Sequence, residues 1–183
     1  EDDVKSGATI VAVDNLGRTV ACSFTMNGTF GAGVIAPATG ILLANLPGTP
    51  RSEFPSVAMM VNENVGLTFF AAAGSGPTPV SVARIAVETI TATNTLTATD
   101  GDMIGAVAAP RSYSTGNPDA AVVEAALSGA EQDELRALGH NLKLVPQIGR
   151  VNGFFCPRGL PRFQVCQFVK DPRSYGLAIT SDE

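Results

Sequence analysis

The segment VAVDNLGRTVACSFTM (11–26) contains two runs of apolar and β-branched residues on either side of Asn-Leu-Gly at 15–17. Asparagine and glycine readily adopt the backbone conformations of tight turns, and apolar runs that flank such a turn are typical of a β-hairpin. We therefore predict two paired strands, over 9–14 and 18–26. The first part of the chain is thus expected to be antiparallel β structure.

A second hairpin is predicted further along the chain. The runs SVAMMVN (56–62) and GLTFFAAA (66–73) are separated by a three-residue connection. Between the two hairpins, the segment 27–50 is rich in glycine and proline, which both destabilise helices. We predict a structured loop there, with one short strand at 41–44.

The second half of the chain mixes helices with strands. Apolar residues at helical spacing after Pro79 predict a helix over 80–94. Gly139 is a usual stop signal for the amphipathic segment 130–139. The other expected elements are a helix at 102–108 and strands at 122–126, 141–145, 149–156 and 163–169. This order predicts an α+β layered fold in a single domain over 1–183, without repeating βαβ units.

Composition narrows the classes of function. Of the 183 residues, 45% are apolar and 16% are charged, against about 25% charged residues in an average domain. Such a low charge fits a chain that gives much of its surface to a partner. The formal net charge of −5 argues against a nucleic-acid-binding protein. We also expect no membrane span, because no run of 18 apolar residues occurs.

Metal and histidine chemistry are not favoured. Cys22, Cys156 and Cys166 lack the paired spacing of a zinc site. The single histidine, His140, falls between a predicted helix and a predicted strand, and we expect it to be structural or exposed. We therefore expect neither a bound metal nor a cofactor.

Several blocks of sequence occur in a characteristic order. They are VAVDNLGRTVACSFTMNGTFGAG (11–33), TGILLAN (39–45), PSVAMMVNENVGLTFFAAAGSG (55–76), APR (109–111), ALGH (137–140) and DPR (171–173). In this order they resemble the small subunit of the gamma-glutamyltranspeptidases, which are N-terminal nucleophile (Ntn) hydrolases. The resemblance implies an αββα sandwich to which this chain contributes the small-subunit part.

The resemblance also implies a nucleophile region at the start of the chain. In the family, the precursor cuts itself before a threonine, whose freed amine then serves as the base for its own hydroxyl. Alignment on Asp14 puts this nucleophile at Gly7, which has no side chain. Ser6 stands one residue earlier and Thr9 two residues later, so these three residues form the candidate region. Ser6 would need removal of Glu1–Lys5, and it is otherwise an ordinary linker serine.

A second candidate region corresponds to the family's oxyanion loop, in which a glycine pair offers backbone N–H groups to the developing oxyanion. Here the aligned residues are Gly74, Ser75 and Gly76. They are followed by Pro77, which has no N–H to donate. The segment is alternatively a tight turn that leads into a helix.

Substrate-binding residues are implied at two places. Asn27 matches an asparagine that grips the gamma-glutamyl group in the family, although it is alternatively a turn residue in left-handed geometry. Arg51 and Ser52 stand where the family has a serine pair, and they could bind a carboxylate. Glu53 follows them and could hold an ammonium group. The three residues are alternatively a solvated polar loop. The family's acidic pair after the TGILLAN block is missing, because Asn45 is followed by LPGTP.

Four residues are expected to be architectural. Arg111 and Arg173 each follow a proline and are expected to tie loops by hydrogen bonds or ion pairs. Cys156 and Cys166 flank PRGLPR almost symmetrically, and they form either a disulfide across a hairpin or two buried thiols.

Three functions are compatible with the sequence. The first is the small-subunit half of a gamma-glutamyltranspeptidase-like amidohydrolase or acyltransferase, paired with a large subunit from the same precursor and acting on a gamma-glutamyl-type small molecule. The second is a catalytically degenerate family member that serves binding or assembly. The third is an unrelated α+β binding domain. The resemblance implies a periplasmic or extracellular location, with a cytoplasmic one left open.

Overall fold

The computed structural model describes residues 7–28, 30–46, 56–64, 66–91, 101–160 and 166–180. The chain divides into two compact units, a larger one made of residues 1–107 and 149–183 and a smaller one made of residues 108–148. We describe each unit by itself. The single domain expected over 1–183 stays a prediction.

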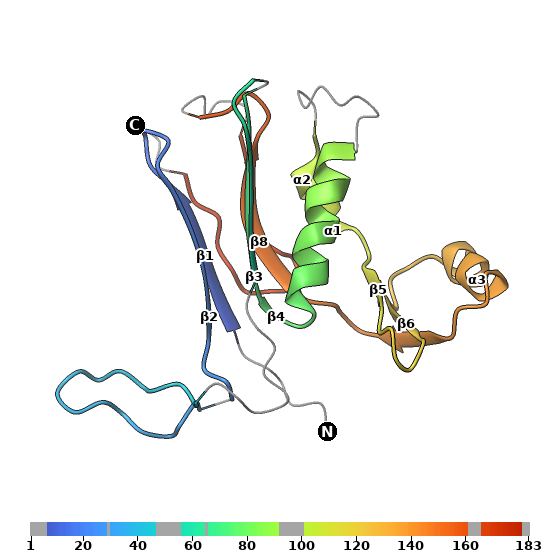
Figure 1. Ribbon diagram of the computed structural model, residues 1–183, viewed down its shortest axis with the longest axis horizontal. Coiled ribbons are helices and arrows are strands. Elements are labelled where there is room, and N and C mark those ends of the chain that lie inside the picture. The colour runs from blue at the N-terminus through green and yellow to red at the C-terminus, as the bar shows by residue number, and fades with distance from the viewer. Residues whose placement is uncertain are drawn as a thin grey trace. The chain divides into compact units, whose positions relative to one another are not determined.

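The larger unit contains two β-sheets and the two helices that precede the smaller unit (Figure 1). Its elements are β1 (Gly7–Val13), β2 (Thr19–Thr25), β3 (Ser56–Asn62), β4 (Leu67–Ser75), α1 (Thr78–Thr91), α2 (Met103–Ala108), β8 (Arg150–Cys156) and β9 (Gln167–Val169). Strands β1 and β2 pair as an antiparallel hairpin. The second sheet has the order β3-β4-β8-β9, and all its pairs are antiparallel.

The central strands β4 and β8 of the four-stranded sheet are covered on both faces, and β4 is apolar on both sides. Alternate side chains of a strand point to opposite faces. Phe69 and its neighbours of the same parity pack against α1 and α2, in a core that includes Ile85 and Met103. Phe70 points the other way, stacks on Phe154, and belongs to a second core that the β1–β2 hairpin covers. The larger unit therefore has three layers, helix, sheet and hairpin (Figure 1).

The smaller unit is a three-stranded sheet with one helix. Its elements are β5 (Ser112–Ser114), β6 (Ala121–Glu124), α3 (Gly129–Ala137) and β7 (Leu142–Val145). Strands β6 and β7 are parallel, so β6, α3 and β7 form one βαβ unit. Ser128 and Glu131 make reciprocal hydrogen bonds at the start of α3, in a capping box.

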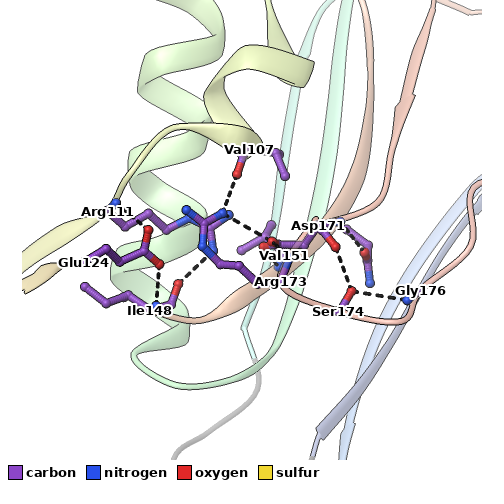
Figure 2. Close-up of polar contacts among 10 residues, drawn as sticks. Val107, Arg111, Glu124, Ile148, Val151, Asp171, Arg173, Ser174 and Gly176 are labelled. Atoms are coloured by element: carbon purple, nitrogen blue, oxygen red, sulfur yellow. Dashed lines mark hydrogen bonds and ion pairs between the residues drawn. The ribbon is translucent and has the colours of Figure 1, made fainter. Parts of the chain in front are cut away.

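A buried arginine and a buried glutamate hold the strand ends of the smaller unit together. Glu124 accepts hydrogen bonds from the backbone N–H groups of Arg111 and Ile148, and the Arg111 guanidinium donates to the Ile148 carbonyl (Figure 2). Both charged side chains are almost fully buried. The expected loop-tying role of Arg111 is thus confirmed.

Most predicted elements are confirmed, with ends that differ from the expected ones by two residues at most among the described residues, but two points need correction. The strand expected at 41–44 is wrong: this part of the loop makes one isolated bridge, between Ile35 and Leu42. Gly31, Gly33 and Gly40 have positive φ there, and the resulting turns interrupt regular pairing. Strand β5 is absent from the sequence-based expectation, because three residues carry no periodic signal. The expected segments 92–94 and 163–165 lie outside the described residues.

The turn between β1 and β2 gives a pH-dependent prediction. The Asp14 carboxylate accepts hydrogen bonds from the backbone N–H groups of Leu16 and Arg18 and from the Arg18 guanidinium. These bonds, chiefly the one from the Arg18 backbone, hold the pKa of Asp14 below its ordinary value of 3.8. A lowered pKa contributes stability above the ordinary value, and that stability is lost as the pH falls through the lowered one.

We therefore expect Asp14→Asn to lower the urea midpoint of unfolding at neutral pH. The difference from the parent protein should shrink below pH 3.8 as the carboxylate of the parent becomes protonated. Urea titrations over a pH series measure this. The exposed carboxylate variant Asp119→Asn is the control, and an Asp14→Asn effect that is the same at all pH values would contradict the assignment.

Candidate functional site

The start of β1 lies directly against the glycine-containing segment at the end of β4. A Cβ atom placed on Gly7 would come within 1.5 Å of the Gly74 carbonyl oxygen. A Cβ placed on Gly74 would come within 2.9 Å of the Gly7 carbonyl carbon. The two backbones thus touch, and neither position has room for a side chain. The structure therefore brings together the nucleophile region and the oxyanion-loop region that the sequence singled out.

Residues 74–76, which we call the glycine corner, leave the sheet at a register shift. The pairing of β4 with β8 is regular up to Ala73 and shifts between Ala73 and Ser75, which leaves Gly74 outside the ladder. Gly76 follows with φ +77, and a Cβ on it would lie within 2.8 Å of the Gly149 nitrogen. Helix α1 begins two residues later. The corner thus combines a bulge and a turn, and its backbone faces the start of β1.

Thr9 is the hydroxyl-bearing residue that the described part of β1 directs inward. Its neighbours Ala8 and Ile10 are exposed on the outer face of the hairpin, whereas Thr9 is half-buried. Its Oγ1 accepts a hydrogen bond of 2.7 Å from the Asn152 amide. Its methyl group lies 3.1 Å from a Cβ built on Gly74. Thr9 is therefore adjacent to the glycine corner and oriented by a side chain of β8.

Asn152 connects Thr9 to a buried carboxylate near the C-terminal end of the described chain. The side-chain oxygen of Asn152 accepts a hydrogen bond from the Asp171 backbone N–H. The Asp171 carboxylate, which is fully buried, accepts bonds from the Val151 and Arg173 backbone N–H groups and from the Arg173 guanidinium (Figure 2). These contacts fix β8 and residues 171–173 relative to the start of β1.

Arg173 completes this group of contacts. Its guanidinium also donates a 2.8 Å hydrogen bond to the Val107 carbonyl at the end of α2 (Figure 2). The arginine thus ties the segment after β9 to the end of α2, as the sequence led us to expect. Neither Asn152 nor Asp171 stands out individually in the sequence. Asp171 belongs to the DPR block that the sequence analysis singled out as a whole. Asn152 is an isolated asparagine in an apolar strand and belongs to no such block.

Asn27 occupies a turn. It has φ +52, in the left-handed region, and its side-chain amide donates a 3.2 Å hydrogen bond to the Asn45 carbonyl. This contact holds the two ends of the long loop after β2 together. It agrees with the alternative interpretation of Asn27 as a turn residue, and its role in binding substrate stays a prediction.

Five other candidates allow little or no structural description. Ser6, Arg51, Ser52 and Glu53 lie outside the described residues. Ser75 is the last residue of β4.

Further findings concern metal ligands, the single histidine, the cysteines and the helices of the described residues. Among them, no group of three or more histidine, cysteine, aspartate and glutamate side chains is arranged to hold a metal ion. His140 is exposed in the smaller unit, and Cys156 forms a disulfide with Cys166. Within the described helices, none combines the length and apolar character needed to span a bilayer.

Large apolar side chains are exposed on two surfaces of the larger unit. The outer face of the β1–β2 hairpin exposes 57% of Ile10 and 52% of Phe24. On β3, the side chains that point away from α1 are also exposed, and they are Val57, Met59 and Val61. Exposed apolar side chains that gather on one face of a strand pair are typical of a surface that contacts another protein.

Comparisons with known proteins bear on the fold of the chain. No family model matches the sequence, and no curated protein matches it. Among solved structures, a gamma-glutamyltranspeptidase from Pseudomonas nitroreducens complexed with L-DON matches 95% of this chain and 99% of its own, with a TM-score of 0.69 and 20% identity. The transpeptidase CapD of Bacillus anthracis matches 96% of this chain and 99% of its own, with a TM-score of 0.70 and 22% identity.

A gamma-glutamyltranspeptidase mutant from Helicobacter pylori matches 91% of this chain and 99% of its own, with a TM-score of 0.66 and 20% identity. The resemblance read from the sequence is therefore confirmed as a resemblance in fold. The almost complete coverage of each matched chain fits a small-subunit portion of that family.

The contact between Gly7 and Gly74 predicts a strong effect of adding one carbon atom. Gly7→Ala would place its Cβ against the Gly74 carbonyl, so the start of β1 would have to move away from the corner. We expect a loss of about 1–3 kcal/mol in the free energy of unfolding, as for other overpacked sites. Denaturant titration measures this loss.

The matched control is Ala8→Ser on the exposed outer face, with an expected change within about 0.5 kcal/mol. Equal stabilities of Gly7→Ala and Ala8→Ser would show that the two backbones do not touch.

Proposed function

We propose that this chain is the small-subunit part of a gamma-glutamyltranspeptidase-like Ntn hydrolase. The reaction is cleavage of a gamma-glutamyl or related amide through an acyl-enzyme. A hydroxyl attacks the amide carbonyl carbon and forms an ester as the amine leaves with a proton. Water or a second amine then takes the acyl group and restores the hydroxyl. No cofactor is required.

The observation that supports this site is the contact between Gly7 and the glycine corner. An Ntn reaction needs the start of a strand, where the nucleophile is exposed by cleavage, beside backbone N–H groups that stabilise the oxyanion. Here β1 begins against residues 74–76, although the two segments are far apart in the sequence. Pro77 cannot donate, so the N–H groups of Ser75 and Gly76 are the proposed donors.

Gly7 itself carries no nucleophile, and a hydroxyl must come from a neighbouring residue. Thr9 is half-buried next to the corner, and the Asn152 amide orients its hydroxyl. Ser6 is the other residue of the candidate region. We propose that one of these two hydroxyls takes the role that threonine has in the family.

The proposed partner is a large subunit made from the same precursor. The described residues of the larger unit supply a helix layer, a sheet and a second β-layer of two strands, to which the large subunit would add the remainder of an αββα sandwich. The exposed apolar side chains of the hairpin and of β3 are the surfaces that such a subunit would cover. The disulfide between Cys156 and Cys166 supports a periplasmic or extracellular location, since disulfides persist in oxidising compartments.

The same contact also favours a second candidate function. A family member that had lost catalysis would no longer need space at the aligned nucleophile position. There is no space for a side chain at Gly7. The Asn27 amide donates its hydrogen bond to the chain's own backbone, at the Asn45 carbonyl. In this second case the fold serves binding or assembly.

Cleavage and turnover separate the two candidates. If the protein is catalytic, mass spectrometry of the full-length product should find a new N-terminus at Ser6 or Thr9. The product should also hydrolyse a chromogenic gamma-glutamyl anilide. Ser6→Ala or Thr9→Val, whichever removes the nucleophile, should lower kcat more than about a thousandfold.

Thr39→Val, in the exposed loop, is the matched control and should leave the rate unchanged. Thr9→Ser should keep measurable activity if Thr9 is the nucleophile. An intact chain without turnover would contradict the catalytic proposal and support the degenerate one.

A further inference from the structure

The β1–β2 hairpin has no ladder with the sheet on which it lies. Among the described residues, β1 and β2 pair only with each other. The hairpin is held on the four-stranded sheet by apolar packing and by side-chain hydrogen bonds, such as those from the Ser23 hydroxyl to the Ala73 and Ser56 carbonyls. A layer without backbone pairing to its neighbour is expected to open before the rest of its unit does.

The disulfide between Cys156 and Cys166 lies at the end of the hairpin that is away from the glycine corner. Strand β1 runs from Gly7, at the corner, to Val13, which packs against the core that contains Cys156. Cys156 is fully buried at the end of β8, and Cys166 is half-buried just before β9. The disulfide is therefore part of the packing under the turn end of the hairpin.

The segment that follows Cys156 contacts the turns of two hairpins. A Cβ placed on Gly17, in the β1–β2 turn, would come within 3.1 Å of the Leu160 Cβ. A Cβ placed on Gly66, in the β3–β4 turn, would come within 2.8 Å of the Arg158 carbonyl oxygen. The segment thus joins the turn of the β1–β2 hairpin to a turn of the four-stranded sheet.

We propose that the Cys156–Cys166 disulfide fixes the β1–β2 hairpin on the sheet, so that the proposed site is assembled in the oxidised protein and loosened in the reduced one. The bond restricts the segment that contacts the hairpin turn. Because β1 is one continuous strand, freedom at its turn end reaches Gly7 and Thr9 at its other end. The effect on catalysis rests on the proposed function, whereas the effect on the hairpin does not.

Formation of the bond needs an oxidant, and a small-molecule disulfide such as glutathione disulfide supplies it. The thiolate of Cys166, the more exposed of the two cysteines, attacks one sulfur of this disulfide, and the other sulfur leaves as a thiol. The Cys156 thiolate then attacks the Cys166 sulfur of the mixed disulfide and releases the second thiol. The protein loses two electrons and two protons, which the two released thiols carry away. A reducing cytoplasm keeps both cysteines as thiols, so the site would be assembled after export.

Hydrogen–deuterium exchange of the full-length protein, followed by mass spectrometry, tests the proposal. The oxidised form is compared with the form treated with dithiothreitol, in which alkylation of the freed thiols confirms that the bond is open. Amides of β1 and β2 should exchange at least about tenfold faster in the reduced form, whereas those of β4 and α1 should change less than about twofold. Equal exchange in both forms, or an equal acceleration in all four strands and helices, would overturn the proposal.

A variant without the bond gives the same test without a reductant. Cys166→Ser leaves Cys156 in the core and should show the fast exchange of the hairpin, with no further effect of dithiothreitol. Cys22→Ser is the matched control, because Cys22 is a half-buried cysteine outside the disulfide, and it should respond to the reductant as the parent protein does. Exchange of the Cys166→Ser hairpin at the parent rate would contradict the proposal.

Turnover separates this regulation from the proposed function. If the protein hydrolyses a chromogenic gamma-glutamyl anilide, reduction should lower the rate at least about tenfold, since misplaced reacting groups lose rate steeply. Reoxidation with glutathione disulfide should restore the rate. A loosened hairpin with unchanged turnover would contradict the link to the site. A loosened hairpin without turnover in either form would support the role of the disulfide and contradict the catalytic function instead.

Discussion

The backbone contact between Gly7 and Gly74 is the constraint on which the proposed site depends. It joins Gly7, the first residue of β1, to Gly74, near the end of β4. The approach is possible because both positions lack a Cβ atom. The register shift after Ala73 frees Gly74 from the ladder with β8, and the hairpin can then approach the sheet closely. This contact places the start of β1 beside the glycine corner.

Polar groups on β8 and in the segment after β9 stabilise the start of β1 next to this contact. The Asn152 side chain donates a hydrogen bond to the Thr9 hydroxyl and accepts one from the Asp171 backbone. The buried Asp171 carboxylate accepts hydrogen bonds from Val151 and Arg173. A buried carboxylate is stable only when such donors surround it. The segments 171–173 and 7–9 therefore depend on each other, although they are at opposite ends of the chain.

The sequence predicts the local structure better than the site. The hairpins and helices follow from turn residues and apolar periodicity, which place β3 at 56–62 with the observed bounds. The strand expected at 41–44 does not form because several glycines in the loop adopt positive φ, which periodicity does not show. Asn152 escapes notice because its partners, Thr9 and Asp171, are distant in sequence, and no spacing pattern joins them. The close approach at Gly7 depends on tertiary packing and cannot be read from the residue itself.

The most direct test of the proposed site is a nuclear Overhauser measurement between the α protons of Gly7 and those of Gly74 in the folded protein. The structure predicts a strong cross-peak between them, accompanied by one from the Thr9 methyl group to Gly74. If the β1–β2 hairpin is folded and neither cross-peak is present, the strand start is not at the glycine corner, and the proposed site is contradicted.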